Sequence, residues 1–122
     1  SFMEIALIII KLIVSLSLLN VWLVQYNKPT RWRGGKAQTI RQEFEAYGLP
    51  SWMLYLVGFI KVGLSLLLIA SIWFLELGDP AAIGLALMLT GSIIMHIKIK
   101  DPLLKSFPAA LFLVLCLVIY YF

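Results

Sequence analysis

The sequence predicts an all-α integral membrane protein: an up-down bundle of four transmembrane helices, with a short amphipathic interfacial helix between the first and second. Of the 122 residues, 62% are hydrophobic and only 13% are charged, whereas a soluble domain carries about a quarter charged residues. Four apolar stretches are long enough, at about 1.5 Å per helical residue, to cross a bilayer core of about 30 Å. The short connections favour sequential antiparallel packing in a single domain, residues 1–122.

The first span covers approximately residues 5–26. It has no basic residues ahead of it, is too long for the core of a signal peptide and lacks a small-residue cleavage site, so we expect it to stay in place as a helix. Lys11 points about 180° away from Asn20, at 100° per residue. Lys11 lies about 9 Å from the outer end, so we expect it to extend to that interface; a second polar site is the alternative.

The longest polar stretch, residues 27–51, begins with the irregular NKPTRWRGGK and continues as an amphipathic segment, residues 36–47. One helical face of this segment carries Ala37, Ile40, Phe44 and Tyr47. Gly48 is a suitable helix C-cap. Two interpretations stay open: the segment lies in the membrane interface, or it only packs on the end of the bundle.

The second span covers residues 52–75 and the third residues 80–97. Between them, Asp79 is a suitable N-cap and Pro80 suits the first helical position. The fourth span, residues 103–122, is expected to start at the interface and to bend near Pro108, because a start at Pro108 itself leaves a helix too short to cross.

The distribution of charge predicts the orientation. Four crossings place the loops 27–51 and 98–107 on one side of the membrane. That side holds the basic residues Lys28, Arg31, Arg33, Lys36, Arg41, Lys98, Lys100 and Lys105. The other side holds Glu4, Glu76 and Asp79 and no Lys or Arg outside a span. The positive-inside rule therefore places both loops in the cytoplasm and both termini outside it. The net charge of +4 belongs to membrane-flanking loops, so we expect no nucleic-acid partner.

Several polar residues lie within the spans. Measured from the basic side, Lys61 is about 13 Å deep, Asn20 about 9 Å and Ser92 about 8 Å, while His96 is near the surface. A charge at such a depth normally faces the bundle interior or water. Convergence of these groups predicts a cavity open toward the cytoplasm, capped by residues 36–47. The candidate ligand-binding residues are Lys61, Asn20, Ser92, His96, Ser65, which shares the face of Lys61, and Glu43.

Lys61 has no carboxylate partner within any span. Four interpretations remain open: it extends toward the interface, it is neutral, it meets backbone carbonyls and Asn20 or an inward-folded Glu43 or Glu45, or it holds an anionic or carbonyl-bearing lipophilic ligand. Our hypothesis is the last, a small amphiphile anchored by Lys61 in the cavity.

No pattern indicates a catalytic site, a metal or a cofactor. Cys116 is the only cysteine and lies in an apolar run, as expected of a small buried side chain. His96 is a lone histidine, and no Cys, Asp or Glu is expected near enough to complete a metal site, so a polar anchor at the interface is its alternative role. There is no Ser-His-acid set, phosphate-binding glycine loop or pair of haem-spaced histidines. An enzymatic activity is therefore not favoured.

The stretches YGLPSWMLYLVGFIKVGLSLLLI, DPAAIGLALMLTGSIIMHIKIKDP and PAALFLVL, with the RGG-containing loop, together resemble the DoxX-like family over most of residues 20–115. The resemblance implies a four-span fold and the bacterial inner membrane. The family takes its name from a subunit linked to thiosulfate oxidation with quinone as acceptor, and distant animal relatives look like assembly factors for other membrane proteins. Many members carry an acidic residue where this chain has Lys61. That difference argues against a proton- or cation-linked role and favours an anionic or carbonyl ligand.

Three functions follow as hypotheses. The first is binding of a lipophilic molecule such as a lipid, a fatty acid or a quinone. The second is a structural or assembly subunit that packs on a membrane-protein partner or on a second copy of itself, because small residues recur at seven-residue spacing at Gly58 and Ser65 and at Gly84 and Gly91. The third, by family analogy alone, is the membrane subunit of a quinone-linked oxidoreductase.

Overall fold

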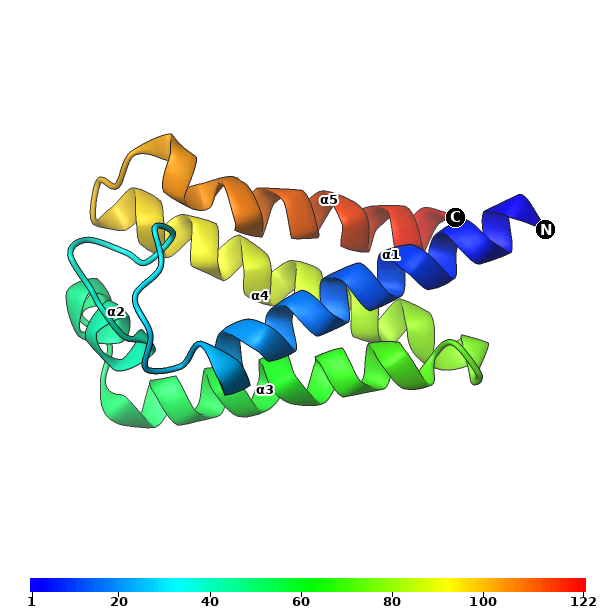
Figure 1. Cartoon of the computed structure of the whole chain (residues 1–122), viewed down its shortest axis with the longest axis horizontal. Coiled ribbons are helices and arrows are strands. Elements are labelled where there is room, and N and C mark those ends of the chain that lie inside the picture. Colours follow the sequence, from blue (N-terminus) through cyan, green and yellow to red (C-terminus); the bar gives the residue numbers. More distant parts are fainter.

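The computed structural model describes residues 1–122 and is helical throughout (Figure 1). The elements are α1 (Phe2–Leu19), continued by a π-helical turn (Asn20–Val24), α2 (Ile40–Tyr47), α3 (Ser51–Ala70), a 3-10 turn (Leu75–Leu77), α4 (Gly78–Lys98), a second 3-10 turn (Leu103–Ser106) and α5 (Phe107–Tyr121). Four helical segments are long and apolar enough to cross a membrane: Phe2–Val24, Ser51–Ala70, Leu75–Lys98 and Leu103–Tyr121.

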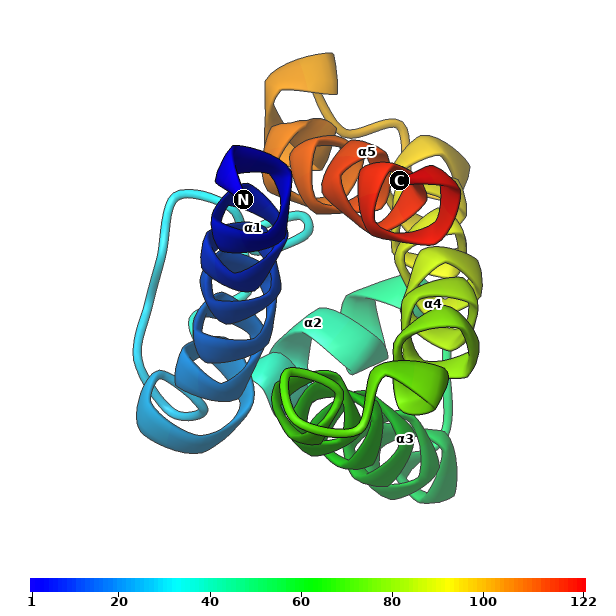
Figure 2. The ribbon, with the colours of Figure 1, turned by 90° about the vertical axis from the view of Figure 1, so that its right-hand side faces the viewer.

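The four long helices form a closed ring when seen end on (Figure 2). Helix α1 contacts α3 and α5, and α4 contacts the same two helices. Consecutive long helices run in opposite directions (Figure 1), so the up-down bundle expected from the short connections is confirmed. Helix α2 is not part of the ring and lies across one of its ends.

The half of the bundle nearest the chain termini is closely packed. Its core consists of Val14, Leu18, Leu68, Ala81, Ala82, Leu85, Ala86, Leu89, Cys116 and Ile119. Small side chains on α4 allow neighbouring helices to approach closely. Cys116 is fully buried in this core, as expected for the lone cysteine.

The opposite half is wider. Helices α1 and α5 diverge toward this end in both views, and α2 and the loop 27–39 occupy the space between the helix ends (Figures 1 and 2). A second, smaller core is formed here by Trp22, Ile40, Phe44 and Leu54. The rings of Trp22 and Phe44 meet edge to face, with 6.0 Å between centroids. At the wide end, α2 therefore takes part in the packing between the first span and α3.

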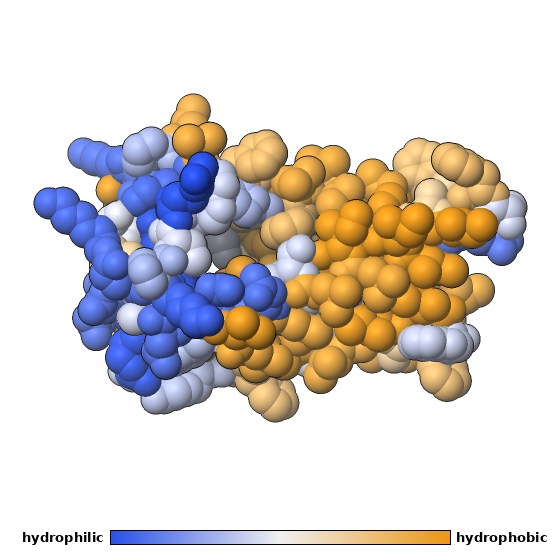
Figure 3. Space-filling model, in the orientation of Figure 1, coloured by the Kyte–Doolittle hydropathy of each residue, from blue (hydrophilic) through white to orange (hydrophobic).

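The surface divides in the same way. In Figure 3 hydrophilic residues gather at the end that carries α2 and the loop 27–39, and a hydrophobic belt covers most of the rest, with a few hydrophilic residues at the opposite end. Large apolar side chains project from the belt, among them Phe59 with 79% of its surface exposed. Such a belt is the surface that a bilayer core covers.

Helix α2 is shorter than predicted, residues 40–47 instead of 36–47. Thr39 has extended backbone angles, and its side-chain Oγ1 accepts a hydrogen bond from the Gln42 amide at 3.1 Å. This N-cap starts the helix after Ala37, which the prediction had included. Gly48 ends the helix at a φ of +78°, so the predicted C-cap is confirmed. The apolar face of α2 is buried against α3 and α4, in line with the interpretation that it packs on the bundle end.

The turn between the second and third spans differs from the prediction. Helix α3 ends at Ala70, before the expected Leu75, and the Ser71 hydroxyl caps it by donating to the Leu68 carbonyl. Asp79 is not an N-cap, because the 3-10 turn Leu75–Leu77 leads directly into α4 and places Asp79 within its first turn. At the fourth span, the 3-10 turn Leu103–Ser106 precedes α5, with Pro108 in the first turn of that helix, close to the interfacial start that was predicted.

Candidate functional site

A cavity of about 620 Å³ lies in the wide half of the bundle. This volume falls in the range of small-molecule sites, roughly 300–1,000 Å³. Every helix contributes to its wall. The apolar part includes Leu18, Met53, Val57, Met88 and Phe112, and the polar part includes Asn20, Gln25, Arg33, Glu43, Tyr47, Lys61, Ser92 and His96. The cavity is thus mostly apolar with polar groups gathered toward one end.

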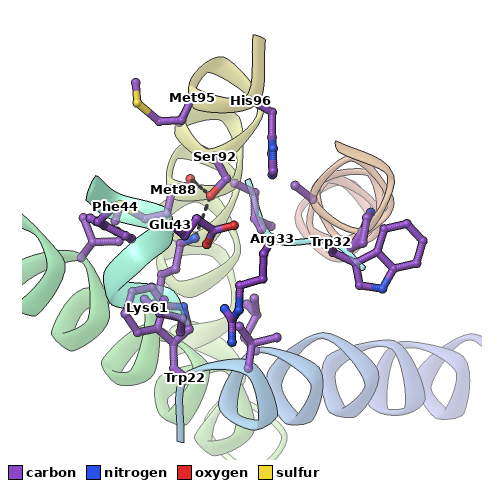
Figure 4. A pocket seen from close by; sticks show the side chains of 18 of the residues that line it. Trp22, Trp32, Arg33, Glu43, Phe44, Lys61, Met88, Ser92, Met95 and His96 are labelled. Carbon is purple, nitrogen blue, oxygen red and sulfur yellow. Dashed lines mark hydrogen bonds between the residues drawn. The ribbon is translucent and has the colours of Figure 1, made fainter. Parts of the chain in front are cut away.

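Lys61 lies halfway along α3 with only 8% of its surface exposed. Its Nζ donates one hydrogen bond, to the Ser92 hydroxyl on α4 at 2.8 Å, and lies 5.8 Å from the centre of the Trp22 ring. No Asp or Glu oxygen lies within 4.0 Å of it. The ammonium does not extend to the interface; it is held inside the cavity with hydrogen-bonding capacity to spare (Figure 4).

The structure brings together most of the residues predicted from the sequence. Asn20, Glu43, Ser92 and His96 line the cavity with Lys61. Ser65 does not line it. The Ser65 hydroxyl donates to the Lys61 carbonyl at 2.7 Å within α3, a common arrangement for a serine in the middle of a helix.

Arg33 was not predicted as a site residue, because it belongs to a polar loop. It is only 4% exposed and lines the cavity. Its guanidinium donates to the backbone carbonyls of Gln25 and Lys28, which holds the loop beneath the end of α1. Burial lowers the pKa of Arg33, and the attraction of the Glu43 carboxylate opposes this effect. The sequence did contain one indication that the loop turns at this point: the adjoining Gly34-Gly35 pair, which marks a sharp change of chain direction.

Two carboxylates fix the glycine pair of this loop. The Gly34 amide donates to Glu43 Oε2 at 2.6 Å, and the Gly35 amide donates to Asp101 Oδ1 at 3.0 Å. Lys105 Nζ donates to the Gly35 carbonyl at 2.6 Å. Acceptors from α2 and from the α4–α5 connection therefore hold the loop over the end of the cavity.

His96 has a carboxylate partner, contrary to the prediction that no acid lies near it. Its Nδ1 is 2.6 Å from Asp101 Oδ2, and its Nε2 is 3.4 Å from the Tyr47 hydroxyl. The chain turns back at the end of α4, where the Asp101 amide donates to the His96 carbonyl, and this turn returns the carboxylate to the ring. Burial raises the pKa of Tyr47 above its ordinary value, so the phenol remains a proton donor. The site contains no group of three metal-ligating side chains.

Lys11 lies away from this site, in the closely packed half. Its side chain extends toward the outer end, as predicted, but it is buried there: its Nζ donates to the Ser71 carbonyl at 3.2 Å, in the turn that joins α3 to α4. That carbonyl is at the end of α3, where the helix leaves backbone acceptors without partners. Lys11 therefore caps a neighbouring helix.

The cavity reaches the side of the bundle between α1 and α5. Val21 and Ser17 from the first span and Ala109 and Phe112 from α5 all line it. Figure 3 shows a hollow on this face, at the boundary between the hydrophilic end and the hydrophobic belt. The opening thus lies at the level where polar headgroups meet hydrocarbon in a bilayer.

The fold and the cavity define a class: a four-span helical membrane protein with a cavity that has a polar end inside one half of its bundle. Within that class, the DoxX-like family model matches residues 33–119, and the chain belongs to this family. No curated protein and no solved structure matches the chain. The matched region begins at Arg33 and includes the Gly34-Gly35 pair, α2, α3, α4 and nearly all of α5. It therefore contains most of the cavity wall.

Proposed function

We propose that this DoxX-like protein binds a small lipophilic or amphiphilic molecule in the bundle cavity, with the polar group of the ligand at Lys61. The observation that carries the proposal is a buried ammonium with a single hydrogen bond and no carboxylate within 4.0 Å, facing a cavity of about 620 Å³. Burying an ammonium without full compensation is costly. A ligand that supplies acceptors for the remaining N–H groups offsets that cost.

The walls support a flexible apolar ligand body. Met53, Met88 and Met95 line the cavity beside Val57 and Phe112. Methionine side chains are unbranched and adapt to ligands of different shape. The side opening between α1 and α5 gives a molecule dissolved in the bilayer a route inward.

The test is mass spectrometry of small molecules extracted from purified protein, comparing the parent with Lys61→Met. Lys36→Met is the matched control, because it removes the same charge from an exposed side chain outside the cavity at the same end. We expect a defined amphiphile from the parent and the control that is missing from Lys61→Met. Identical profiles from all three proteins would overturn the proposal.

The second candidate function is a structural or assembly subunit of a larger membrane complex. The small residues that suggested it are partly used inside the bundle. A side chain on Gly58 would meet Trp22, and one on Gly84 would meet Leu64. Gly63 and Gly91 both have open space beside them, but Gly91 lines the cavity, so exposed Gly63 is the position of this set left for an external helix. Mass measured in mild detergent separates a monomer from an obligate complex.

A quinone-linked oxidoreductase subunit is the third candidate. The cavity accommodates a quinone ring by volume, and the same extraction would identify it. An absorbance spectrum with flavin or haem bands would favour this function over simple binding. For all three functions, we propose the bacterial inner membrane as the location, with the loops 27–51 and 98–107 in the cytoplasm and both termini outside it.

A further inference from the structure

The charges around the cavity do not balance. Its charged lining residues are Arg33, Glu43, Lys61 and Lys105. Lys105 already has a counter-charge, because its Nζ lies 4.0 Å from Asp101 and donates to the Gly35 carbonyl. Glu43 therefore remains as the single carboxylate for two cations, Lys61 and Arg33. One positive charge in excess is left at the polar end.

Neither of these two cations forms an ion pair within the protein. No nitrogen of Lys61 or Arg33 lies within 4.0 Å of a carboxylate oxygen. The Arg33 guanidinium donates only to backbone carbonyls, and Lys61 donates only to a serine hydroxyl. Glu43 itself is held by the Gly34 amide at 2.6 Å. The three charged side chains enter the cavity from α2, α3 and the loop 27–39 and point toward one another (Figure 4).

We propose that the cavity selects a monoanionic amphiphile, an acyl chain with a carboxylate or phosphodiester headgroup that takes its place among Lys61, Arg33 and Glu43. The inference rests on the proposed function and specifies its ligand class. A headgroup with one negative charge neutralises the excess, and its oxygens accept the free N–H groups of Lys61 in charge-assisted hydrogen bonds. A neutral carbonyl supplies acceptors but leaves the excess charge buried.

The position of the opening agrees with this ligand. The hollow between α1 and α5 lies where the hydrophobic belt meets the hydrophilic end (Figure 3). An acyl chain passing there remains beside apolar residues such as Val21 and Phe112, while its headgroup turns toward Lys61. The acyl chain thus passes an apolar part of the cavity wall.

The test compares probes that differ only in charge. Native mass spectrometry of the protein in a nonionic detergent would be titrated with hexadecanoate against 1-hexadecanol, and with phosphatidylglycerol against diacylglycerol of the same acyl chains. We expect the anionic member of at least one pair to bind about tenfold more tightly or better, as charge-assisted hydrogen bonds imply. The pair that shows the preference identifies a free carboxylate or a phospholipid as the source.

Three variants make the test specific. Lys61→Met should abolish the anion preference, and Lys61→Arg should keep it, because only the charge is required. Glu43→Gln should strengthen it, since the variant removes the competing carboxylate while its amide oxygen can still accept from Gly34. A purely structural role for Glu43 predicts weaker binding instead. Lys36→Met is the control that should leave the preference unchanged. If Lys61→Met fails to fold, the Glu43→Gln variant still tests the proposal.

The outcomes separate the two proposals. Equal binding of the anionic and neutral probes would overturn the monoanion while leaving the cavity a binding site. No binding of any probe, together with identical extracts from the parent and Lys61→Met, would overturn both. A preference that persists in Lys61→Met would also overturn the inference, because the anion would then bind elsewhere.

Discussion

Asp101 Oδ2 lies 2.6 Å from His96 Nδ1, across the turn where the chain leaves α4 and approaches α5. The same carboxylate accepts the amide of Gly35, 66 positions earlier in the chain. One buried side chain therefore joins the end of α4, the α4–α5 connection and the loop that covers the cavity.

Asp101→Asn should loosen this junction. An amide keeps a hydrogen bond but loses the charge that strengthens it, so we expect a loss of about 1–3 kcal/mol in stability. We also expect faster proteolysis within residues 27–39. Thermal unfolding in detergent and limited proteolysis measure the two effects. Glu45→Gln, which removes an exposed carboxylate at the same end, is the control. Unchanged proteolysis in Asp101→Asn would show that the carboxylate does not hold the loop.

Two glycines of α3 should respond in opposite ways to alanine. A Cβ at Gly58 would lie 2.8 Å from Trp22 Cζ3, whereas a Cβ at Gly63 has nothing within 4 Å. Gly58→Ala should therefore cost about 1–3 kcal/mol through overpacking, and Gly63→Ala should gain up to about 1 kcal/mol from helix propensity. Unfolding in detergent measures both. Equal effects would contradict the position of Trp22 against α3.

Tyr47 should make the protein sensitive to alkali. Burial raises the pKa of its phenol above the unfolded value of about 10. Its stabilising contribution is therefore complete below pH 10 and decreases as the pH rises further, by about 1.4 kcal/mol per pH unit. Unfolding measured from pH 9 to 11.5 should show this slope in the parent and a shallower one in Tyr47→Phe. Tyr121→Phe, at an exposed tyrosine, should keep the parental slope, and a Tyr47→Phe slope equal to it would contradict the burial of the phenol.

The membrane orientation can be tested with single cysteines. Cys116 is fully buried, so Cys116→Ala provides a background without an accessible thiol. In that background, Asp79→Cys should react with a membrane-impermeant maleimide in intact cells, and Lys100→Cys should react only after lysis. These expectations follow from the basic loops lying in the cytoplasm. The reverse labelling pattern would invert the proposed topology.

The sequence predicts the features that depend on local chemistry. The four spans follow from their length and apolar composition, and the end of α2 follows from Gly48, whose left-handed backbone suits a residue without a side chain. The grouping of Lys61 with Ser92 was also predictable, because they lie at similar depths along antiparallel helices, whereas Glu43 was only one of several alternative partners. These features need only spacing along the chain.

The rest depends on contacts between distant segments. The pairing of Gly35 with Asp101 and the burial of Arg33 arise where a loop folds back over the bundle. The periodicity of apolar residues does not predict such a contact. The same limit explains why the hydrogen-bond partner of Lys11 was not predicted. Its partner is the free carbonyl of Ser71, 60 positions away, which becomes available only once α3 ends at Ala70.

The two halves of the bundle differ in how firmly they resist deformation. Around Cys116 the helices touch through small side chains, whereas around Lys61 they surround a cavity of about 620 Å³. Close-packed interiors are stiff, and hollow ones have fewer contacts to lose. One leaflet of the bilayer therefore surrounds the stiffer half of the bundle, and the other surrounds the half that deforms more easily. Lateral pressure in the leaflet beside the basic loops acts on the cavity, while the same pressure in the other leaflet acts on a rigid wall.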